Sequence, residues 1–399
     1  MQLHVAPQVV PIAAAPLRDG GVLVDGGWIV AVGPAGELRQ RAAAVTEHPG
    51  VLMPGLVNAH AHLQYGPSFA DLAVGGMAFP DWIGQMMQRR MLMSDGGWRA
   101  EVAQSWELAR ASGTVAVADI VTNVVALDVD VPGVRYLESV AIASDGWPAE
   151  RDRLDPVLAG HHDTGLSPHT LYTIGTAVLR GSIELARQNR RRLHPHLAET
   201  IDEDQFVRHG EGPFAAFDFA AELRGGAGNG RSPAEYLDSI GGLGTDVHVA
   251  HGTHLGEADR ALLRSRGTAV ALCTRSNAIL EAGVPPIAAL LREGGPIAVG
   301  TDSLASTPDL DLLAEARALV VAAAAQGYEE SDLAARILHA CTAGGAYAIG
   351  RPDLGVLATG ASAALAHVTV DDPASADIVA EIMRTGRAEP VRAQADSIT

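Results

Sequence analysis

The chain has 399 residues, of which 47% are apolar and 19% charged, so it can bury a large core and is not expected to be disordered. A net charge of −18 at pH 7 argues against a nucleic-acid partner and against binding to an anionic membrane surface. All 29 basic residues are arginine, which excludes Schiff-base lysines, P-loop phosphate binding and a carbamylated lysine bridging two metals.

The two ends of the chain are alike, with short β-rich runs separated by glycine and aspartate. Residues 21–33, GVLVDGGWIVAVG, place Asp-Gly-Gly between two β-branched runs, a pattern typical of a hairpin. The segment from residue 350 onward contains a comparable run, LGVLATGASAALAHVTV. We therefore predict that residues 1–53 and 350–399 meet in one small β-domain.

Between these ends, short apolar runs alternate eight times with helical segments such as SIELARQNRRR and ADRALLRSR. This alternation predicts the α/β class and, more narrowly, a TIM-type (β/α)8 barrel over residues 54–349. A doubly wound sheet is the alternative, but no glycine-rich phosphate turn follows the first run. The predicted strands span residues 52–60, 114–120, 134–143, 163–170, 192–199, 246–252, 268–274 and 296–302.

The first residues carry no basic region ahead of their apolar stretch, as a signal peptide would. No window approaches the roughly 18 consecutive apolar residues of a membrane span. Cys273 and Cys341, the only cysteines, cannot build a disulfide framework. These features predict a cytoplasmic protein that does not bind membranes.

Several histidines stand at the ends of predicted strands, where a barrel gathers its catalytic groups. His60 and His62 are two residues apart on one strand, so both imidazoles face the same side. His196 on the fifth predicted strand and Asp302 on the eighth would complete three nitrogen ligands and one oxygen ligand. One coordination position then stays open for water. We predict that these four residues hold one divalent metal ion.

Two further residues could make such a metal site catalytic. Glu199 lies three residues after His196, beyond the strand end, so its carboxyl group can reach the open position. There it could take a proton from water and deliver it to the substrate. His251 ends the sixth predicted strand and could orient or polarise the attacking water.

Four motifs, PGLVNAHAH, HLAE, HVAHGTHL and GTDSLAS, resemble in order and spacing those of the amidohydrolase superfamily, in its cytosolic aminohydrolase branch. The resemblance covers nearly the whole chain and implies a (β/α)8 barrel with a small β-sandwich built from both termini. It implies that Glu199 is the proton shuttle, that His251 polarises the attacking water and that Asp302 helps pass protons to departing ammonia. It also implies one metal ion, zinc or alternatively iron, held by His60, His62, His196 and Asp302.

Within this branch, GLSPHTLYT, HLQYGPSFADL and LCTRSNAIL resemble segments of enzymes that deaminate 6-amino-6-deoxyfutalosine to futalosine in menaquinone biosynthesis. The resemblance implies an adenine nucleoside as the small-molecule substrate and a homodimer as the assembly. Arg275 is a candidate for pairing with a substrate carboxylate, and Trp82 for stacking on the purine. The residues expected at the substrate are His169, Arg275, Asn277, Trp82 and Ser303.

The motifs leave other functions open, because the same metal and Glu199 would serve several substrates. One alternative is a deaminase of adenosine, methylthioadenosine or S-adenosylhomocysteine. Another is a hydrolase that releases an amide or halide from a triazine- or guanine-like ring. A non-catalytic amidohydrolase-like scaffold would be expected to lose one or more ligands, whereas all six metal and catalytic positions are filled here.

Overall fold

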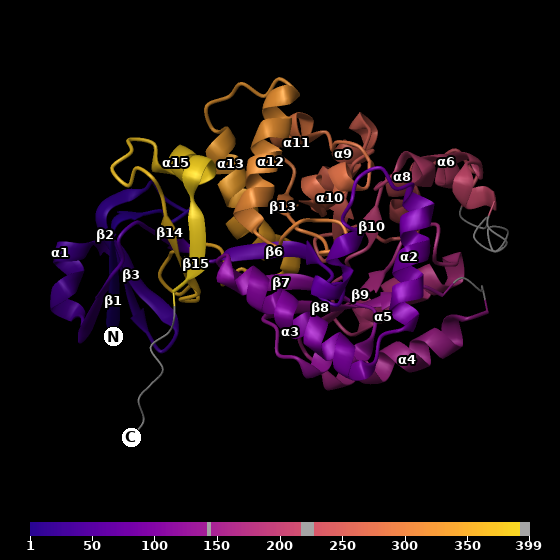
Figure 1. Ribbon diagram of the computed structural model, residues 1–399, viewed down its shortest axis with the longest axis horizontal. Helices are drawn as coiled ribbons and strands as arrows, with labels where there is room; N and C mark the ends of the chain where they lie inside the picture. The colour runs from indigo at the N-terminus through magenta and orange to yellow at the C-terminus, as the bar shows by residue number, and fades with distance from the viewer. Residues whose placement is uncertain (142–144, 217–226, 392–399) are drawn as a thin grey trace.

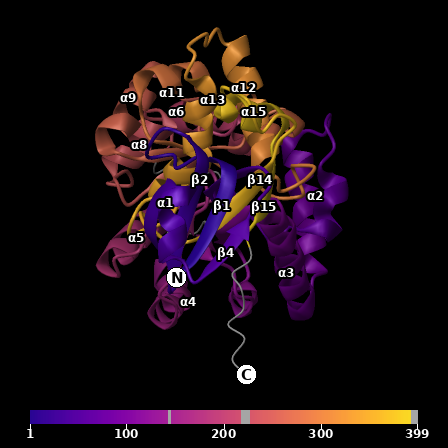
Figure 2. The same cartoon turned by 90° about the vertical axis from the view of Figure 1, so that its left-hand side faces the viewer.

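The two ends of the chain form one seven-stranded sheet in the computed structural model, which describes residues 1–141, 145–216 and 227–391 (Figure 1). The strand order is β15-β14-β5-β1-β2-β3, and β4 also pairs with β1. Gly26 and Gly27, both with positive φ, turn the chain between β2 and β3, so the predicted hairpin is present. Figure 2 looks onto this end of the molecule. The strands are β1 (Gln2–Val9), β2 (Leu17–Asp25), β3 (Trp28–Pro34), β4 (Ala44–Glu47), β5 (Val51–Pro54), β14 (Leu365–Thr369) and β15 (Arg387–Pro390).

The first predicted strand, residues 52–60, is two strands in the structure. β5 ends at Pro54 in the terminal sheet, and β6 begins a second sheet two residues later. Gly55 between them packs so closely on Val115 that a Cβ would lie 2.1 Å from its Cγ1 atom. Proline cannot donate a ladder hydrogen bond and only glycine fits next to Val115, so the chain changes sheets here. The prediction of one continuous strand was wrong.

Eight parallel strands form two four-stranded sheets, in the orders β6-β7-β8-β9 and β10-β11-β12-β13. Leu193 joins the sheets through parallel bridges to Leu166 and Val247. At the other edges, the Asp302 N–H donates to the His60 carbonyl at 3.0 Å. The strands are β6 (Leu56–Ala61), β7 (Thr114–Val121), β8 (Gly133–Ser139), β9 (Thr164–Pro168), β10 (His196–Leu197), β11 (His248–His251), β12 (Ala269–Leu272) and β13 (Ile297–Val299).

The seven strands β7 to β13 match the remaining seven predicted ones. Two predicted segments, the strand over residues 134–143 and the C-terminal part over residues 350–399, run into residues 142–143 and 392–399, which lie outside the described residues. β6 and β9 are buried along their whole length, as expected for parallel strands covered by helices. The strands and helices share one large hydrophobic core, to which helix α15 (Ile378–Thr385) of the C-terminal segment contributes Ile382.

Helices follow the parallel strands along the chain and surround them (Figure 1). The longer ones are α2 (Phe79–Met91), α3 (Asp95–Ala111), α4 (Trp147–Gly160), α5 (Thr176–Gln188), α6 (Ile201–His209), α9 (Glu257–Arg266), α12 (Leu312–Ala325) and α15 (Ile378–Thr385). The shorter ones are α1 (Ala35–Leu38), α8 (Pro233–Ser239), α10 (Thr274–Ile279), α11 (Ile287–Glu293), α13 (Leu333–His339) and α14 (Gly345–Ile349). Single turns of 3-10 or π-helix are η1 (Arg39–Arg41), η2 (Pro67–Leu72), η3 (Val124–Asp128), η4 (Pro213–Ala216) and η5 (Ala340–Gly344).

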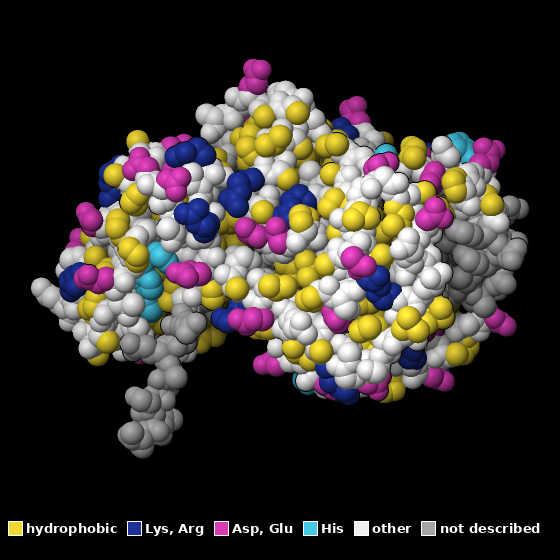
Figure 3. Space-filling view, in the orientation of Figure 1, with side chains coloured by type: hydrophobic (Ala, Val, Ile, Leu, Met, Phe, Trp, Pro, Cys, Tyr) yellow, Lys and Arg dark blue, Asp and Glu magenta, His cyan; other side chains and the backbone are white. Residues whose placement is uncertain are grey.

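Two further features concern helix hydrophobicity and surface charge. Among the described residues, no helix has both the length and the apolar character needed to cross a bilayer. On the face drawn in Figure 3, arginine side chains lie among acidic ones and do not form a continuous basic patch.

Candidate active site

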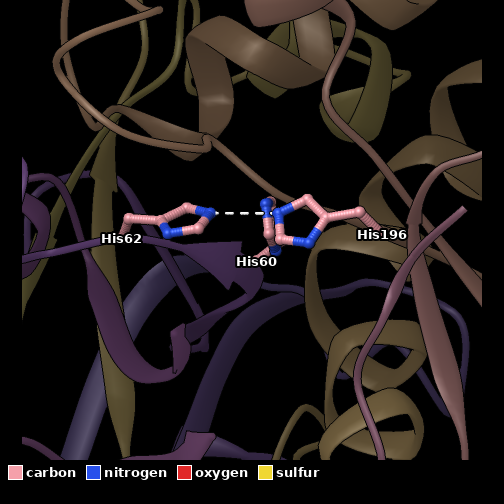
Figure 4. Close-up of side chains that lie close together, drawn as sticks. All are labelled: His60, His62 and His196. Atoms are coloured by element: carbon pink, nitrogen blue, oxygen red, sulfur yellow. Dashed lines mark hydrogen bonds between the residues drawn. The ribbon is translucent and has the colours of Figure 1, made fainter. Parts of the chain in front are cut away.

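Ring nitrogens of three histidines converge at the ends of β6 and β10 (Figure 4). His60 lies in β6, His62 follows that strand directly, and His196 begins β10. His62 Nε2 lies 3.1 Å from His196 Nε2, and Asp302 Oδ1 lies 3.6 Å from His60 Nε2 and 3.7 Å from His62 Nε2. All four side chains are buried, and His60 Nε2 has no hydrogen-bond partner among the described residues. The fold therefore brings together the four side chains predicted as metal ligands.

These separations fit a small divalent cation. Ligand atoms about 2.1 Å from a tetrahedral zinc ion lie about 3.4 Å from one another. His60 Nε2 is buried without a hydrogen-bond partner next to the Asp302 carboxylate. A cation bound by both groups would explain this arrangement. Three imidazole nitrogens and one carboxylate oxygen suit either zinc or iron.

A chain of hydrogen bonds behind His60 sets which of its nitrogens carries the proton. His194 Nδ1 lies 3.0 Å from the His248 carbonyl oxygen, which can only accept, so this nitrogen donates. His194 Nε2 must then accept from His60 Nδ1, 2.8 Å away. His60 Nε2 is left without a proton, facing Asp302. The orientation of His60 is thus fixed by His194 and, behind it, by the carbonyl group of His248. Metal-binding histidines are commonly oriented by such hydrogen bonds through their second ring nitrogen.

The environment keeps His60 and His196 neutral and Asp302 ionised, the forms in which these groups bind a metal. Burial lowers the pKa of His60 to about 4 and the pKa of His196 well below its ordinary value. Burial by itself would raise the pKa of Asp302, but its contact with His60 and the neighbouring histidine charges outweigh burial and lower it. Ser276 Oγ and Ser306 Oγ donate to Asp302 Oδ2 at 2.6 Å and 2.9 Å. Oδ1 accepts from the Ser303 N–H at 2.9 Å and faces the histidines.

Glu199 lies two residues beyond β10, with its Oε1 atom 3.6 Å from His251 Nε2. Burial raises the pKa of Glu199, as does the charge of Asp302, while His251 opposes the shift. A raised pKa suits a carboxyl group that exchanges protons near neutral pH. His251 Nδ1 lies 3.0 Å from Asn277 Oδ1, and the Asn277 amide nitrogen donates to Thr253. Nδ1 therefore holds a proton, and Nε2 is the nitrogen that faces Glu199.

The backbone at this site is strained. Ala198, His251 and Asp302 have φ values of 52°, 70° and 62°, a left-handed region that residues with a Cβ rarely occupy. Such residues cost about 1–3 kcal/mol each and cluster at functional sites. Here they lie at or just past the ends of β10, β11 and β13, where the chain leaves the strand direction next to the four grouped side chains.

A cavity of about 170 Å³ lies against the histidines, Glu199 and Asp302. One wall comes from α2, and the lining includes three of the five residues expected at the substrate, namely His169, Trp82 and Ser303. His169 Nδ1 lies 2.8 Å from Thr173 Oγ1, and the Trp82 indole donates to the Ala305 carbonyl at 3.0 Å.

Arg275 and Asn277 do not line this cavity. Arg275 donates to Asp309 at 2.9 Å, and its Nε lies 3.7 Å from Glu315 Oε2. A guanidinium already bonded to Asp309 and packed against Glu315 is not free to receive a substrate carboxylate. Asn277 is fully buried behind His251 and orients it. This geometry argues against the expected substrate contact for both residues and gives them supporting roles.

Several residues of the site were not singled out by the sequence, and four of them carry a charge or an imidazole ring. His194 stands two residues before His196, so the alternation that picked out the first histidine pair could have found it. Glu138, at the end of β8, lies 3.7 Å from His169 Nε2, and its place at a strand end was the available signal. The packing of α2 alone brings Arg90 to the cavity. The four residues are Arg90, Glu138, His194 and His248.

Comparison with known proteins decides the family. The profile of the amidohydrolase family matches residues 51–391, and that of a bacterial imidazolonepropionase-like composite domain matches residues 20–44. The chain belongs to the amidohydrolase family. This confirms the resemblance carried by the motifs, and it makes the protein a hydrolase that acts on C–N bonds other than peptide bonds.

Individual relatives agree with this assignment. The amidohydrolase is 30% identical over 377 residues to a 5-methylthioadenosine/S-adenosylhomocysteine deaminase of Pelotomaculum thermopropionicum, covering 89% of this chain and 81% of the relative. It is similar to the zinc-bound structure of an adenosine deaminase from Xanthomonas campestris, with a TM-score of 0.79, 26% identity and coverage of 98% and 92%. It shares its fold with Helicobacter pylori aminofutalosine deaminase bound to methylthio-coformycin, with a TM-score of 0.79, 20% identity and coverage of 98% of both chains.

Proposed function

We propose that this amidohydrolase is a metal-dependent hydrolytic deaminase of an adenine nucleoside. The observation that carries the proposal is the meeting of three histidines, Asp302 and the Glu199–His251 pair at one cavity. The names of the relatives, which include methylthioadenosine/S-adenosylhomocysteine and adenosine deaminases, support an adenine nucleoside as the substrate class.

His60, His62, His196 and Asp302 are the residues that would hold the metal, zinc or iron. When bound, a divalent cation there would lower the pKa of water toward neutrality and so supply a nucleophile. Glu199 takes the proton from the attacking water and gives it to the ring nitrogen next to the amine-bearing carbon. His251 directs the water through Nε2, since its Nδ1 is held by Asn277. Asp302 helps pass a proton to the departing ammonia.

The favoured substrate is 6-amino-6-deoxyfutalosine, which would give futalosine and ammonia and place the protein in menaquinone biosynthesis. The motif resemblance supports this choice, and the fold shared with an aminofutalosine deaminase agrees with it. Methylthioadenosine or S-adenosylhomocysteine is the second candidate, favoured by the names of sequence relatives. His169, Trp82 and Ser303 would contact the substrate from the cavity wall.

We also propose that the two parallel sheets close into one (β/α)8 barrel over residues 54–349. The bridges of Leu193 and the hydrogen bond between Asp302 and His60 support closure on both sides. Residues 1–53 and 350–399 would then form the small β-sandwich domain. The homodimer and the cytoplasmic location stay predictions.

Ammonia release by zinc- or iron-loaded protein tests the function, with 6-amino-6-deoxyfutalosine, adenosine, methylthioadenosine and S-adenosylhomocysteine compared side by side. Glu199→Gln is expected to keep the metal and lose roughly 10²- to 10⁴-fold in kcat, the usual contribution of a general acid–base. Glu211→Gln makes the same change at an exposed site just beyond α6 and should keep full activity. Near-normal turnover by Glu199→Gln would overturn the role assigned to Glu199, and no ammonia from any nucleoside would overturn the proposed function.

A further inference from the structure

One face of α2 forms an apolar wall of the cavity. The residues it contributes follow the three- and four-residue spacing of a single helix face. All but the last are apolar, and the indole of Trp82 stacks on the ring of Phe79 at 5.9 Å. The six residues are Phe79, Trp82, Ile83, Met86, Met87 and Arg90.

Among the described residues, Arg90 is the one arginine in the cavity lining. Its guanidinium carbon lies 5.9 Å from the centre of the Tyr65 ring, and its Nη1 lies 3.6 Å from the sulfur of Met87. Neither contact neutralises it. Although burial opposes the shift, the charges of His169, His62 and Arg90 lower the pKa of Glu138, so Arg90 lies within electrostatic reach of that carboxylate. It nevertheless forms no ion pair with any carboxylate of residues 1–141, 145–216 and 227–391. Its neighbour Arg89 pairs instead with Asp71 outside the cavity.

The acidic groups of the lining are already engaged. Glu138 accepts from Thr122 Oγ1 at 2.7 Å and lies 3.7 Å from His169 Nε2, while Glu199 and Asp302 face His251 and the other histidines. Arg90 is therefore a half-buried cation at a cavity, available to an anion that enters it. A guanidinium next to apolar side chains recognises a carboxylate best, through two parallel hydrogen bonds.

We propose that Arg90 binds a carboxylate at the far end of the substrate, so that the enzyme selects adenine nucleosides whose 5′ arm is apolar and ends in a carboxylate. This inference rests on the proposed function. The purine would lie at Glu199 and the histidines, and the apolar side chains of α2 would cover the arm. A nucleoside with a neutral arm would leave the guanidinium desolvated and unpaired. An arm with both an ammonium and a carboxylate would bring a second positive charge toward Arg90, so S-adenosylhomocysteine should be a weaker substrate.

The test compares 6-amino-6-deoxyfutalosine with its methyl ester, which differs only in lacking the negative charge. We expect wild-type enzyme to prefer the acid in kcat/KM, mainly through KM. Arg90→Met keeps a long apolar side chain and should reduce the acid-to-ester ratio of kcat/KM by roughly 10- to 100-fold, the range for a lost charge-assisted hydrogen bond. Arg89→Met, a matched change on the outer side of the same helix, should leave that ratio unchanged.

The ratio is independent of how much enzyme folds, because both substrates are measured on one preparation. An unchanged ratio in Arg90→Met, or a wild-type enzyme that deaminates acid and ester equally, overturns the role of Arg90 while the deaminase function stands. No ammonia from any nucleoside with metal-loaded wild-type enzyme overturns the proposed function, and this inference with it. A lower acid-to-ester ratio of kcat/KM in Arg90→Met, together with an unchanged ratio in Arg89→Met, supports the assignment.

Discussion

His194 decides where His60 carries its proton, so replacing it tests whether the grouped histidines form a prepared metal site. His194→Phe keeps an aromatic ring against His248, whose ring centre is 3.7 Å away, and removes both ring nitrogens. The Nδ1–H of His60 then loses its acceptor, and the carbonyl of His248 loses its donor. His60 becomes free to carry its proton on Nε2, where the proton blocks a metal.

The size of the effect follows from these two hydrogen bonds. Each buried group left without a partner costs about 1–3 kcal/mol, so His194→Phe should lower the free energy of unfolding of the metal-free protein by about 2–6 kcal/mol. Loss of a residue that orients a metal ligand typically weakens metal binding about 10- to 100-fold. That loss corresponds to about 1.4–2.7 kcal/mol of binding free energy.

Zinc affinity, measured by competition with a chromogenic chelator, and urea unfolding of the metal-free protein separate the two effects. His4→Phe is the matched control, because His4 is also buried and its Nδ1 lies 3.0 Å from His48 Nε2, far from the site in the terminal sheet. It should lose stability and keep its zinc affinity. A folded His194→Phe protein that binds zinc as tightly as wild type would refute the reasoning.

Three further predictions follow from individual contacts. Burial raises the pKa of Glu315 to about 8, so the folded protein keeps a proton that the unfolded chain releases above about 4.5, and stability falls as pH rises through this window. In urea unfolding, the wild-type free energy of unfolding should fall between pH 5.5 and pH 8, and Glu315→Gln should reduce that fall by up to about 3 kcal/mol. An equal fall in the variant would contradict this prediction. Trp82→Phe removes the hydrogen bond to Ala305, worth about 1 kcal/mol, so KM should rise about five-fold with little change in kcat. Ser276→Ala removes one of two hydroxyl donors to Asp302 and should weaken zinc binding up to about ten-fold in chelator competition.

Most of the candidate metal site could be predicted, because the positions of its side chains follow from patterns within short stretches of the sequence. Side chains two residues apart on a strand face the same side whatever surrounds the strand, so the positions of His60 and His62 already implied a shared direction. The alternation of apolar runs with helices placed His196 and Asp302 at strand ends. The hairpin at Gly26–Gly27 was likewise predicted from its turn residues, which adopt the positive φ that glycine allows.

Other features depend on residues that are distant in sequence. Strand β5 was missed as a separate element because its partners are β1 and β14, and the latter lies some three hundred residues away in the chain. The role of His194 depends on His60 and the His248 carbonyl, neither of which is near it in sequence. No local pattern reports such contacts.

The sequence by itself therefore indicated the kind of chemistry: histidine and carboxylate side chains at strand ends, with a glutamate three residues after one of the predicted metal ligands. Only the tertiary structure decided which arginine meets the cavity. Arg275 and Arg90 look equally available in the sequence, but Arg275 is held by Asp309 and Glu315. Helix α2 turns Arg90 into the cavity, where it forms no ion pair with a carboxylate of the described residues. Whether a cation is free for a substrate depends on which carboxylates folding brings within a few ångströms of it, and chain order does not set that distance.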